Sequence, residues 1–254
     1  MPETKADTQT LYMVQMWLEM KRLVELARAL HLPLNRTDDN YITHCALKEL
    51  FGDIAPAPFS VEKGDARHLR VLGYCSVPLT ELQIRAREYA SPLGYEICNW
   101  DRLASKPMPD RFTAGTRLQF KLRACPVVRK SSEGKYHSAG TEVDAFLSRV
   151  WEVDDPEVDI DRAEVYNDWL QDQFARRGGA KLLSSRLKRF SIERMVRRAH
   201  EKDRTSTVIK RPDSTLEGQL EVTEPEAFQS LLKKGIGRHT SFGFGMLKVR
   251  PAGS

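Results

Sequence analysis

"STLEGQLEVTEPEAFQSLLKKGIGRHTSFGFGMLKV", residues 214 to 249, contains in succession the local patterns of a strand, a helix and a glycine-rich loop. Up to Val222 the apolar and polar side chains alternate, as they do in a strand with one buried face. Thr223 is then placed to cap a helix, Pro225 falls within its first turn and Gly235 ends it. This order is typical of the second half of a βαββαβ unit.

The residues on either side of this stretch complete the unit. After the glycines, the apolar residues 244–249 predict a last strand. Upstream, residues 116–130 alternate before becoming wholly apolar, as a half-buried strand does. Helices are expected at 141–151 and 161–179, and an extended segment over much of 180–196.

The N-terminal half has the same order of elements, with one additional helix after the first strand. Strands are expected at 10–20, 58–63, 68–77 and 94–106, with further extended residues near Phe112. Helices are expected at 21–32, 41–52 and 79–90, the second capped by Asp38, Asp39 or Asn40 and the third opened by Thr80.

Two such units in one chain predict an α+β protein with tandem ferredoxin-like domains, at residues 1–115 and 116–254. The RNA-recognition motif shares this topology. Its aromatic signature is missing from the first and third strand of either unit, so RNA would have to bind to another surface.

Composition narrows the class of protein. Of the 254 residues, 41% are hydrophobic and 30% charged, which is typical of a soluble globular protein and not of a disordered one. No apolar run approaches the ~18 residues of a membrane span, and the polar first ten residues do not resemble a secretory signal. The four cysteines (Cys45, Cys75, Cys98 and Cys125) are scattered without a CxxC pair, which favours reduced, buried thiols over a zinc site.

The positive charge is concentrated in one segment. Between Arg176 and Arg211 there are thirteen basic and three acidic residues, a net charge of +10 in a chain whose total is +5. Such a segment indicates either a polyanionic partner or a solvated surface. A membrane-binding helix is disfavoured, because the segment lacks a clean apolar face with aromatic anchors.

The glycine-rich loop does not match the common nucleotide-binding loops. A Rossmann fingerprint follows a strand and opens a helix, and a phosphate-binding loop carries a Lys-Ser or Lys-Thr pair after its glycines. Here the loop follows a helix and precedes a strand. What remains is a loop whose glycines allow positive φ angles and the close approach of another backbone, or a tight structural crossing between helix and strand.

Tyr41 and His44 are three residues apart near the start of a predicted helix, so they share one face of it. Leu47, Leu50 and Phe51 provide the side of that helix that we expect to be buried. A single histidine on a helix is more often structural than catalytic, although a phenol can orient an imidazole. His239, in the glycine-rich loop, is the alternative candidate.

These features together resemble the CasE endoribonucleases, which process precursor CRISPR RNA in type I-E and related effector systems. The resemblance runs from about Leu11 to Pro251 and rests on "AFQSLLKKGIGRHTSFGFGMLKV", "FKLRACPVVRK" and "YITHCALKELF". It implies tandem ferredoxin-like domains and cleavage of RNA at the 3′ edge of a repeat hairpin without metal or cofactor. The ribose 2′-OH would attack the adjacent phosphate, leaving a 2′,3′-cyclic phosphate and a 5′-OH.

The resemblance also implies roles for individual residues. The family's catalytic histidine and its companion tyrosine fall on His44 and Tyr41. The basic groove that grips the RNA stem falls on the segment 184–198, with further contacts expected from the glycine-rich loop. The expected RNA-binding residues are Arg186, Lys188, Arg189, Arg194, Arg197, Arg198, Arg238 and His239, and the loop glycines are Gly235, Gly237, Gly243 and Gly245.

The implied partners are the repeat RNA stem-loop and the other subunits of a multisubunit effector complex, among them the backbone subunit next to the 3′ hairpin. The implied location is a prokaryotic cytoplasm, with no membrane partner. Two other classes stay open: a non-catalytic RNA-binding subunit, and an unrelated ferredoxin-like metabolic enzyme, against which the basic segment argues.

Overall fold

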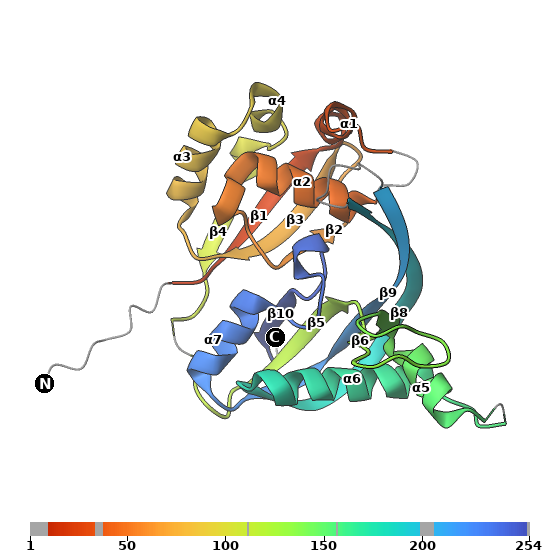
Figure 1. Cartoon of the computed structure of the whole chain (residues 1–254). Helices are drawn as coiled ribbons and strands as arrows, with labels where there is room; N and C mark the ends of the chain where they lie inside the picture. Colours follow the sequence, from red (N-terminus) through yellow and green to blue (C-terminus); the bar gives the residue numbers. More distant parts are fainter. Residues whose placement is uncertain (1–9, 34–37, 111, 156, 199–205, 253–254) are drawn as a thin grey trace, which may run out of the picture.

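The computed structural model describes residues 10–33, 38–110, 112–155, 157–198 and 206–252. It contains two four-stranded antiparallel sheets with helices packed against each, one sheet in each half of the chain (Figure 1). Within the described residues, no helix is long and apolar enough to cross a membrane.

The N-terminal half has the strand order β2-β3-β1-β4, the order of a ferredoxin-like sheet. Its strands are β1 (Tyr12–Glu19), β2 (Phe59–Glu62), β3 (His68–Cys75) and β4 (Ala104–Pro107). Its helices are α1 (Met20–Ala29), α2 (Asp39–Phe51), α3 (Leu79–Tyr89) and α4 (Pro92–Tyr95), with short 3-10 turns η1 (Gly52–Ile54) and η2 (Trp100–Arg102).

The C-terminal half repeats this order as β10-β5-β9-β8. Its strands are β5 (Arg117–Ala124), β8 (Ala180–Arg198), β9 (Ser206–Val222) and β10 (Leu247–Pro251), and β6 (Val127–Arg129) pairs separately with β7 (Glu142–Asp144). Its helices are α5 (Ala145–Val153), α6 (Arg162–Arg177) and α7 (Pro225–Lys234), with the 3-10 turn η3 (Thr240–Phe242). The predicted α+β class and tandem ferredoxin-like topology are confirmed.

Several predicted boundaries are wrong. Most of 94–106 is helical or turn, and only β4 is extended. The expected strand at 116–130 ends at Ala124, and its last residues belong to β6 in the separate two-stranded sheet. Residues 142–144 form β7 instead of the start of a helix, and the last strand begins at Leu247 because residues 244–246 still belong to the glycine-rich loop.

Two predicted helix caps are also wrong. The helix α3 begins at Leu79, so Thr80 lies inside the first turn and Pro78 occupies the N-cap. The N-cap of α7 is Glu224, while the backbone N–H of Thr223 donates to the carbonyl of Gly179 across the sheet edge (3.0 Å). A side-chain oxygen caps a helix only from the residue directly before the first helical residue, where it can accept from the N–H groups of the first turn.

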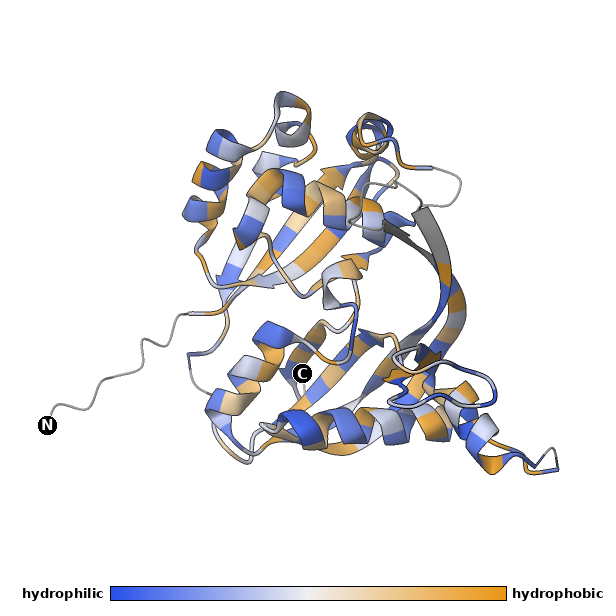
Figure 2. Cartoon of the chain, viewed as in Figure 1, coloured by the Kyte–Doolittle hydropathy of each residue, from blue (hydrophilic) through white to orange (hydrophobic). Residues whose placement is uncertain are grey.

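The two halves share part of their hydrophobic core. One buried cluster, which includes Val14, Leu47 and Val71, belongs to the N-terminal half. The other fills the C-terminal half and also takes in residues from the N-terminal side of the predicted boundary, namely Leu11, Tyr74, Met108 and Phe112. Figure 2 shows hydrophobic residues interspersed with hydrophilic ones along the strands of both sheets. We propose that the domain boundary lies near residue 115 and that the two domains are joined by this shared hydrophobic core.

Three of the four cysteines (Cys75, Cys98 and Cys125) are buried and Cys45 is partly buried; none of the four forms a disulfide. Burial raises the pKa of Cys98 to about 12. These thiols therefore pack as small apolar side chains, as expected.

Candidate active site

Helix α2 presents Tyr41 and His44 toward the glycine-rich loop. The Asp38 carboxylate caps this helix by accepting a hydrogen bond from the Tyr41 backbone N–H (2.8 Å), and Gly52 ends it with φ of 61°. Further along the helix Leu47, Leu50 and Phe51 are buried, as predicted. The helix is therefore capped at its first turn and packed into the core along its later turns.

The ring of Phe242, in η3 of the loop, covers both side chains. It is stacked on Tyr41, with ring centroids 5.9 Å apart and planes at 6°, and lies 4.7 Å from the His44 ring. The Tyr41 and His44 rings are 6.2 Å apart. Three aromatic rings from two distant parts of the sequence thus form one cluster.

His44 is half-buried in this cluster. Burial lowers the pKa of its imidazole below the ordinary value, and the nearby charge of Lys48 lowers the pKa further, whereas a hydrogen bond with the backbone of Ser241 works in the opposite direction. Since the unperturbed pKa is ~6.5, the lowered pKa leaves the ring neutral near pH 7, ready to accept a proton.

The glycine-rich loop approaches α2 so closely that only glycine fits at the contact. Its four glycines have positive φ angles: Gly235 (73°), Gly237 (78°), Gly243 (78°) and Gly245 (78°). A Cβ on Gly243 would lie 2.5 Å from Oδ1 of Asn40, and one on Gly245 would lie 2.5 Å from the carbonyl oxygen of Ile236. The loop is thus a tight structural crossing, whereas the approach of its backbone to a ligand stays a prediction.

Arg238 and His239 are held by one carboxylate, that of Glu142 in β7. Arg238 Nε lies 2.5 Å from Glu142 Oε1, and His239 Nε2 lies 2.9 Å from Oε2. Arg211 from β9 contacts the same carboxylate at 3.2 Å. Burial lowers the pKa of His239, although the charge of Glu142 opposes this.

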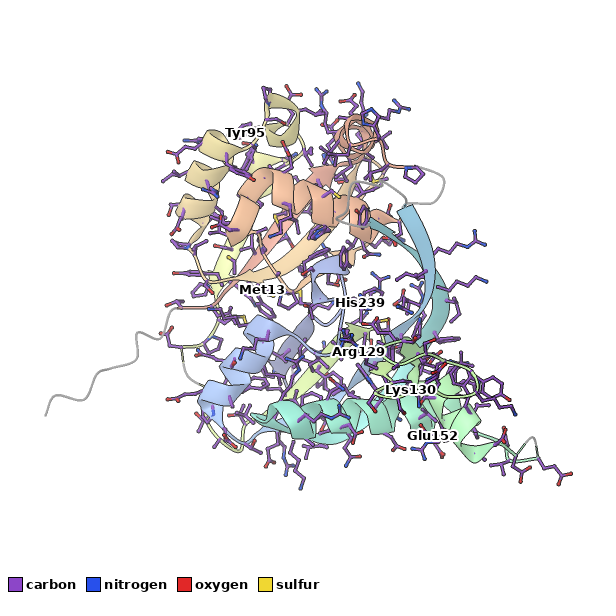
Figure 3. The ribbon with its side chains drawn as sticks, viewed as in Figure 1. Met13, Tyr95, Arg129, Lys130, Glu152 and His239 are labelled. Carbon is purple, nitrogen blue, oxygen red and sulfur yellow. The ribbon has the colours of Figure 1, made fainter. Side chains whose placement is uncertain are left out.

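His239 also approaches the aromatic cluster. Its ring lies 6.5 Å from that of Phe242, and Figure 3 places it between the two halves of the molecule, near Arg129. The two candidate histidines therefore lie beside the same phenylalanine ring.

The predicted RNA-binding residues of β8 do not share one face. In the pairing of β8 with β9, Arg186 lies opposite Glu217 and Arg189 lies opposite Thr215. Directly paired residues point to the same face of a sheet, so both arginines point to the face that is not covered by helices. Arg194 pairs with Lys210 and points to the other face, while Lys188 is the extra residue of a bulge. The side chains of Arg197 and Arg198 lie outside the described residues.

The described basic side chains of β8 are exposed, namely those of Lys181, Arg186, Lys188, Arg189 and Arg194. Arg186 lies 3.6 Å from Glu217 and Arg189 lies 3.9 Å from Glu193, both at the surface. The β8–β9 hairpin extends past the other strands and curves along the N-terminal half (Figure 1).

Four residues around the site were not predicted from the sequence: Phe242, Glu142, and the pair Arg123 and Asp213, in which the guanidinium donates to the carboxylate at 2.9 and 2.7 Å. A role for Phe242 in the site could have been predicted, because it is an aromatic residue within the glycine-rich loop, directly before Gly243. Glu142 and Asp213 carry no local signal, because their partners lie 97 and 90 residues away in the sequence. Among the described residues, no three His, Cys, Asp or Glu side chains converge in a way that could hold a metal ion.

A family model described as "CRISPR associated protein" matches residues 11–251. A curated relative, the CRISPR-associated endoribonuclease Cse3 of Thermus thermophilus, is 27% identical over 153 residues, which are 58% of this chain and 61% of that protein. The aligned region thus spans less than two thirds of that relative's length.

Two solved structures share the fold at low identity. Thermus thermophilus Cse3 bound to an RNA representing a pre-cleavage complex matches with a TM-score of 0.61 and 16% identity, covering 95% of this chain and 100% of that chain. A chain of a CRISPR RNA-guided surveillance complex matches with a TM-score of 0.51 and 15% identity, again over 95% and 100% of the two chains.

Proposed function

This chain belongs to the CRISPR-associated protein family, and we propose that it is an endoribonuclease that cleaves precursor CRISPR RNA at the repeat hairpin. The observation that carries the proposal is the half-buried His44, with its lowered pKa, beside the rings of Tyr41 and Phe242. The similarity to Cse3, a CRISPR-associated endoribonuclease, supports the same activity.

In the proposed reaction the ribose 2′-oxygen attacks the adjacent phosphorus and the bond from phosphorus to the 5′-oxygen breaks. The 2′-OH loses its proton to a base, and the leaving 5′-oxygen gains one, so the products are a 2′,3′-cyclic phosphate and a 5′-OH. We assign the proton-accepting role to His44, because its pKa keeps the ring neutral at pH 7. Tyr41 orients the imidazole, and no metal enters these steps.

We assign RNA binding to the basic hairpin and to the glycine-rich loop. Exposed arginines contact the phosphates of an A-form stem, which is recognised mainly by shape and backbone. The contributing residues in this proposal are Arg186, Lys188, Arg189, Arg194, Arg197, Arg198, Arg238 and His239.

After cleavage the protein keeps its product and joins a CRISPR effector complex in a prokaryotic cytoplasm, next to the backbone subunit at the 3′ hairpin. The fold shared with a chain of a CRISPR RNA-guided surveillance complex supports this part of the proposal.

The test is cleavage of the cognate repeat RNA in buffer containing a chelator. Wild type should cut once at the 3′ edge of the hairpin and leave a cyclic phosphate. His44→Ala should lower the single-turnover rate by about 10²–10⁴-fold, with RNA affinity unchanged.

Three outcomes would contradict the proposal. If His44→Ala cleaves as fast as wild type, the assignment of His44 is wrong, and His239→Ala becomes the next variant to test. Tight binding by wild type without any cleavage would indicate a non-catalytic RNA-binding subunit, and an absence of RNA affinity would indicate an unrelated enzyme.

A further inference from the structure

Arg123, at the end of β5, connects three parts of the molecule. Its Nε and Nη2 donate to the two carboxylate oxygens of Asp213 on β9, at 2.9 and 2.7 Å. Its Nη1 donates to the side-chain oxygen of Asn40 at 2.5 Å. Asn40 lies in the first turn of α2, directly before Tyr41, so this one guanidinium joins the C-terminal sheet to the helix that carries the candidate reactive residues.

The same residue also holds the glycine-rich loop. Its backbone carbonyl accepts a hydrogen bond from the N–H of Gly245 (2.7 Å), and its guanidinium lies 4.5 Å from the centre of the Phe244 ring. The Asn40 side chain in turn packs on Gly243 with no room for a Cβ. Arg123 therefore anchors the segment that directly follows Phe242, the ring that covers His44.

The contacts of Arg123 are shielded from water and depend on the planar geometry of its guanidinium group. The Asp213 side chain is 4% exposed and that of Arg123 is 20% exposed, so the ion pair is largely shielded from water. A planar guanidinium can serve a carboxylate with two parallel N–H groups and still direct a third N–H to another acceptor, which the ammonium group of lysine cannot do with the same geometry.

We propose that Arg123, with Asp213 and Asn40, is a positioning residue that locks helix α2 against the C-terminal half, so that Tyr41, His44 and Phe242 come together in reactive geometry. The inference rests on the proposed function in so far as His44 is the group that transfers the proton. It assigns no contact with RNA to Arg123.

The first test measures single-turnover cleavage at saturating enzyme together with equilibrium binding of the repeat RNA. Asn40→Ala and Arg123→Lys should each lower the rate by about tenfold or more, because small misplacement of reacting groups is costly, while the dissociation constant stays near the wild-type value. Asn40→Asp restores an acceptor for Arg123 and should recover most of the rate.

A matched control is available on the same strand. Arg117 pairs with Glu221 on β9 at 3.3 Å, but its side chain is 67% exposed and it lies at the opposite end of β5 from Arg123. Arg117→Gln should leave cleavage and binding unchanged. It therefore reports any general effect of removing an arginine–carboxylate pair between β5 and β9.

A second readout does not depend on cleavage, namely the pKa of His44 followed by NMR titration of the histidine resonances. Release of α2 from Arg123 exposes the imidazole, so Asn40→Ala should raise the His44 pKa toward its ordinary value, whereas Arg117→Gln should not. If wild type fails to cleave, the proposed function fails, but this titration still tests the positioning role.

Rates and His44 pKa values that stay at the wild-type level in both Asn40→Ala and Arg123→Lys would overturn the inference. A loss of RNA affinity as large as the loss of rate would also overturn it, since that would make the network part of the binding surface. A selective loss of rate, recovered by Asn40→Asp, would support it.

Discussion

At the level of single residues, the chemistry of His44 depends on one neighbour that is remote in sequence. Its position next to Tyr41 follows from helical spacing, but its lowered pKa follows from burial beside the ring of Phe242, which shields it from water. An imidazole on an open helix surface would keep a pKa of ~6.5. The loop therefore contributes to the lowered pKa of the residue to which we assign catalysis.

Phe242→Ala should raise the His44 pKa toward its ordinary value, because removing the ring lets water reach the charged form. If His44 is the base, the acidic limb of the pH–rate profile should move upward with it. NMR titration of His44 and the pH dependence of single-turnover cleavage measure the two shifts. Phe242→Tyr keeps a ring over the imidazole and is the matched control; an unchanged pKa in Phe242→Ala would contradict the argument.

At the level of helices and strands, local patterns predicted most of the segments but not where each one ends. The glycine-rich loop shows why. Residues 244–246 are as apolar as a strand, yet they bend through Gly245 to meet Ile236 and Arg123, and pairing with β5 starts only at Leu247. Apolarity indicates burial, and burial in a tight loop has the same sequence signal as burial in a sheet.

The β8–β9 hairpin supports a prediction about salt dependence. Replacing Arg186, Lys188 and Arg189 together by Ala should weaken binding of the repeat hairpin and flatten its dependence on salt, by about 0.9 in the logarithmic slope for each phosphate that is no longer neutralised. Binding curves at several salt concentrations give the slope. Arg149→Ala on α5, exposed and outside the hairpin, is the control.

Arg194→Ala tests the two faces of the same hairpin. Arg194 points away from the face of Arg186 and Arg189. If the RNA stem lies on one face of the hairpin, one of the two variants, the triple variant or Arg194→Ala, should lose more affinity for RNA than the other. Unchanged binding in all of these variants would place the RNA on another surface.

At the level of the whole molecule, the two halves are joined by buried side chains and not only by a linker. The hydroxyl of Tyr74, in the N-terminal sheet, donates to the carbonyl of Leu247 in the C-terminal sheet (2.9 Å), and Phe112 packs edge-on against Phe228 with centroids 4.8 Å apart. The two halves should therefore unfold together.

Phe112→Ala should destabilise the whole protein by about 3–5 kcal/mol, as expected for an aromatic side chain removed from a core. Urea unfolding followed by circular dichroism and by tryptophan fluorescence should show one coincident transition, shifted to lower urea. Two separate transitions, with only one of them shifted, would show that the halves fold independently.

Stability should also fall as the solution becomes mildly acidic. His44 and His239 both have folded-state pKa values below the unfolded value of ~6.5, so the unfolded chain binds more protons in that range. Their contribution is fully present above pH ~6.5 and is lost as the pH falls through the two lowered pKa values. Urea midpoints at about pH 7.5 and 5.5 measure the effect, which His44→Gln should reduce; equal midpoints in wild type would contradict it.

Several features of this protein follow from the amino-acid sequence alone: the order of most elements, the repeated βαββαβ pattern, the shared face of Tyr41 and His44, and the need for glycine in the loop. Each of these depends on periodicity or on backbone angles within a few residues, which neighbouring side chains report directly.

Which distant surfaces meet is a property of the folded chain. The stacking of Phe242 on Tyr41, the carboxylate of Glu142 beside Arg238 and His239, and the bond from Arg123 to Asn40 join residues 83 to 201 positions apart. Such contacts arise because two sheets with helices pack against each other. A one-dimensional pattern shows that each surface exists but not which other surface it will contact.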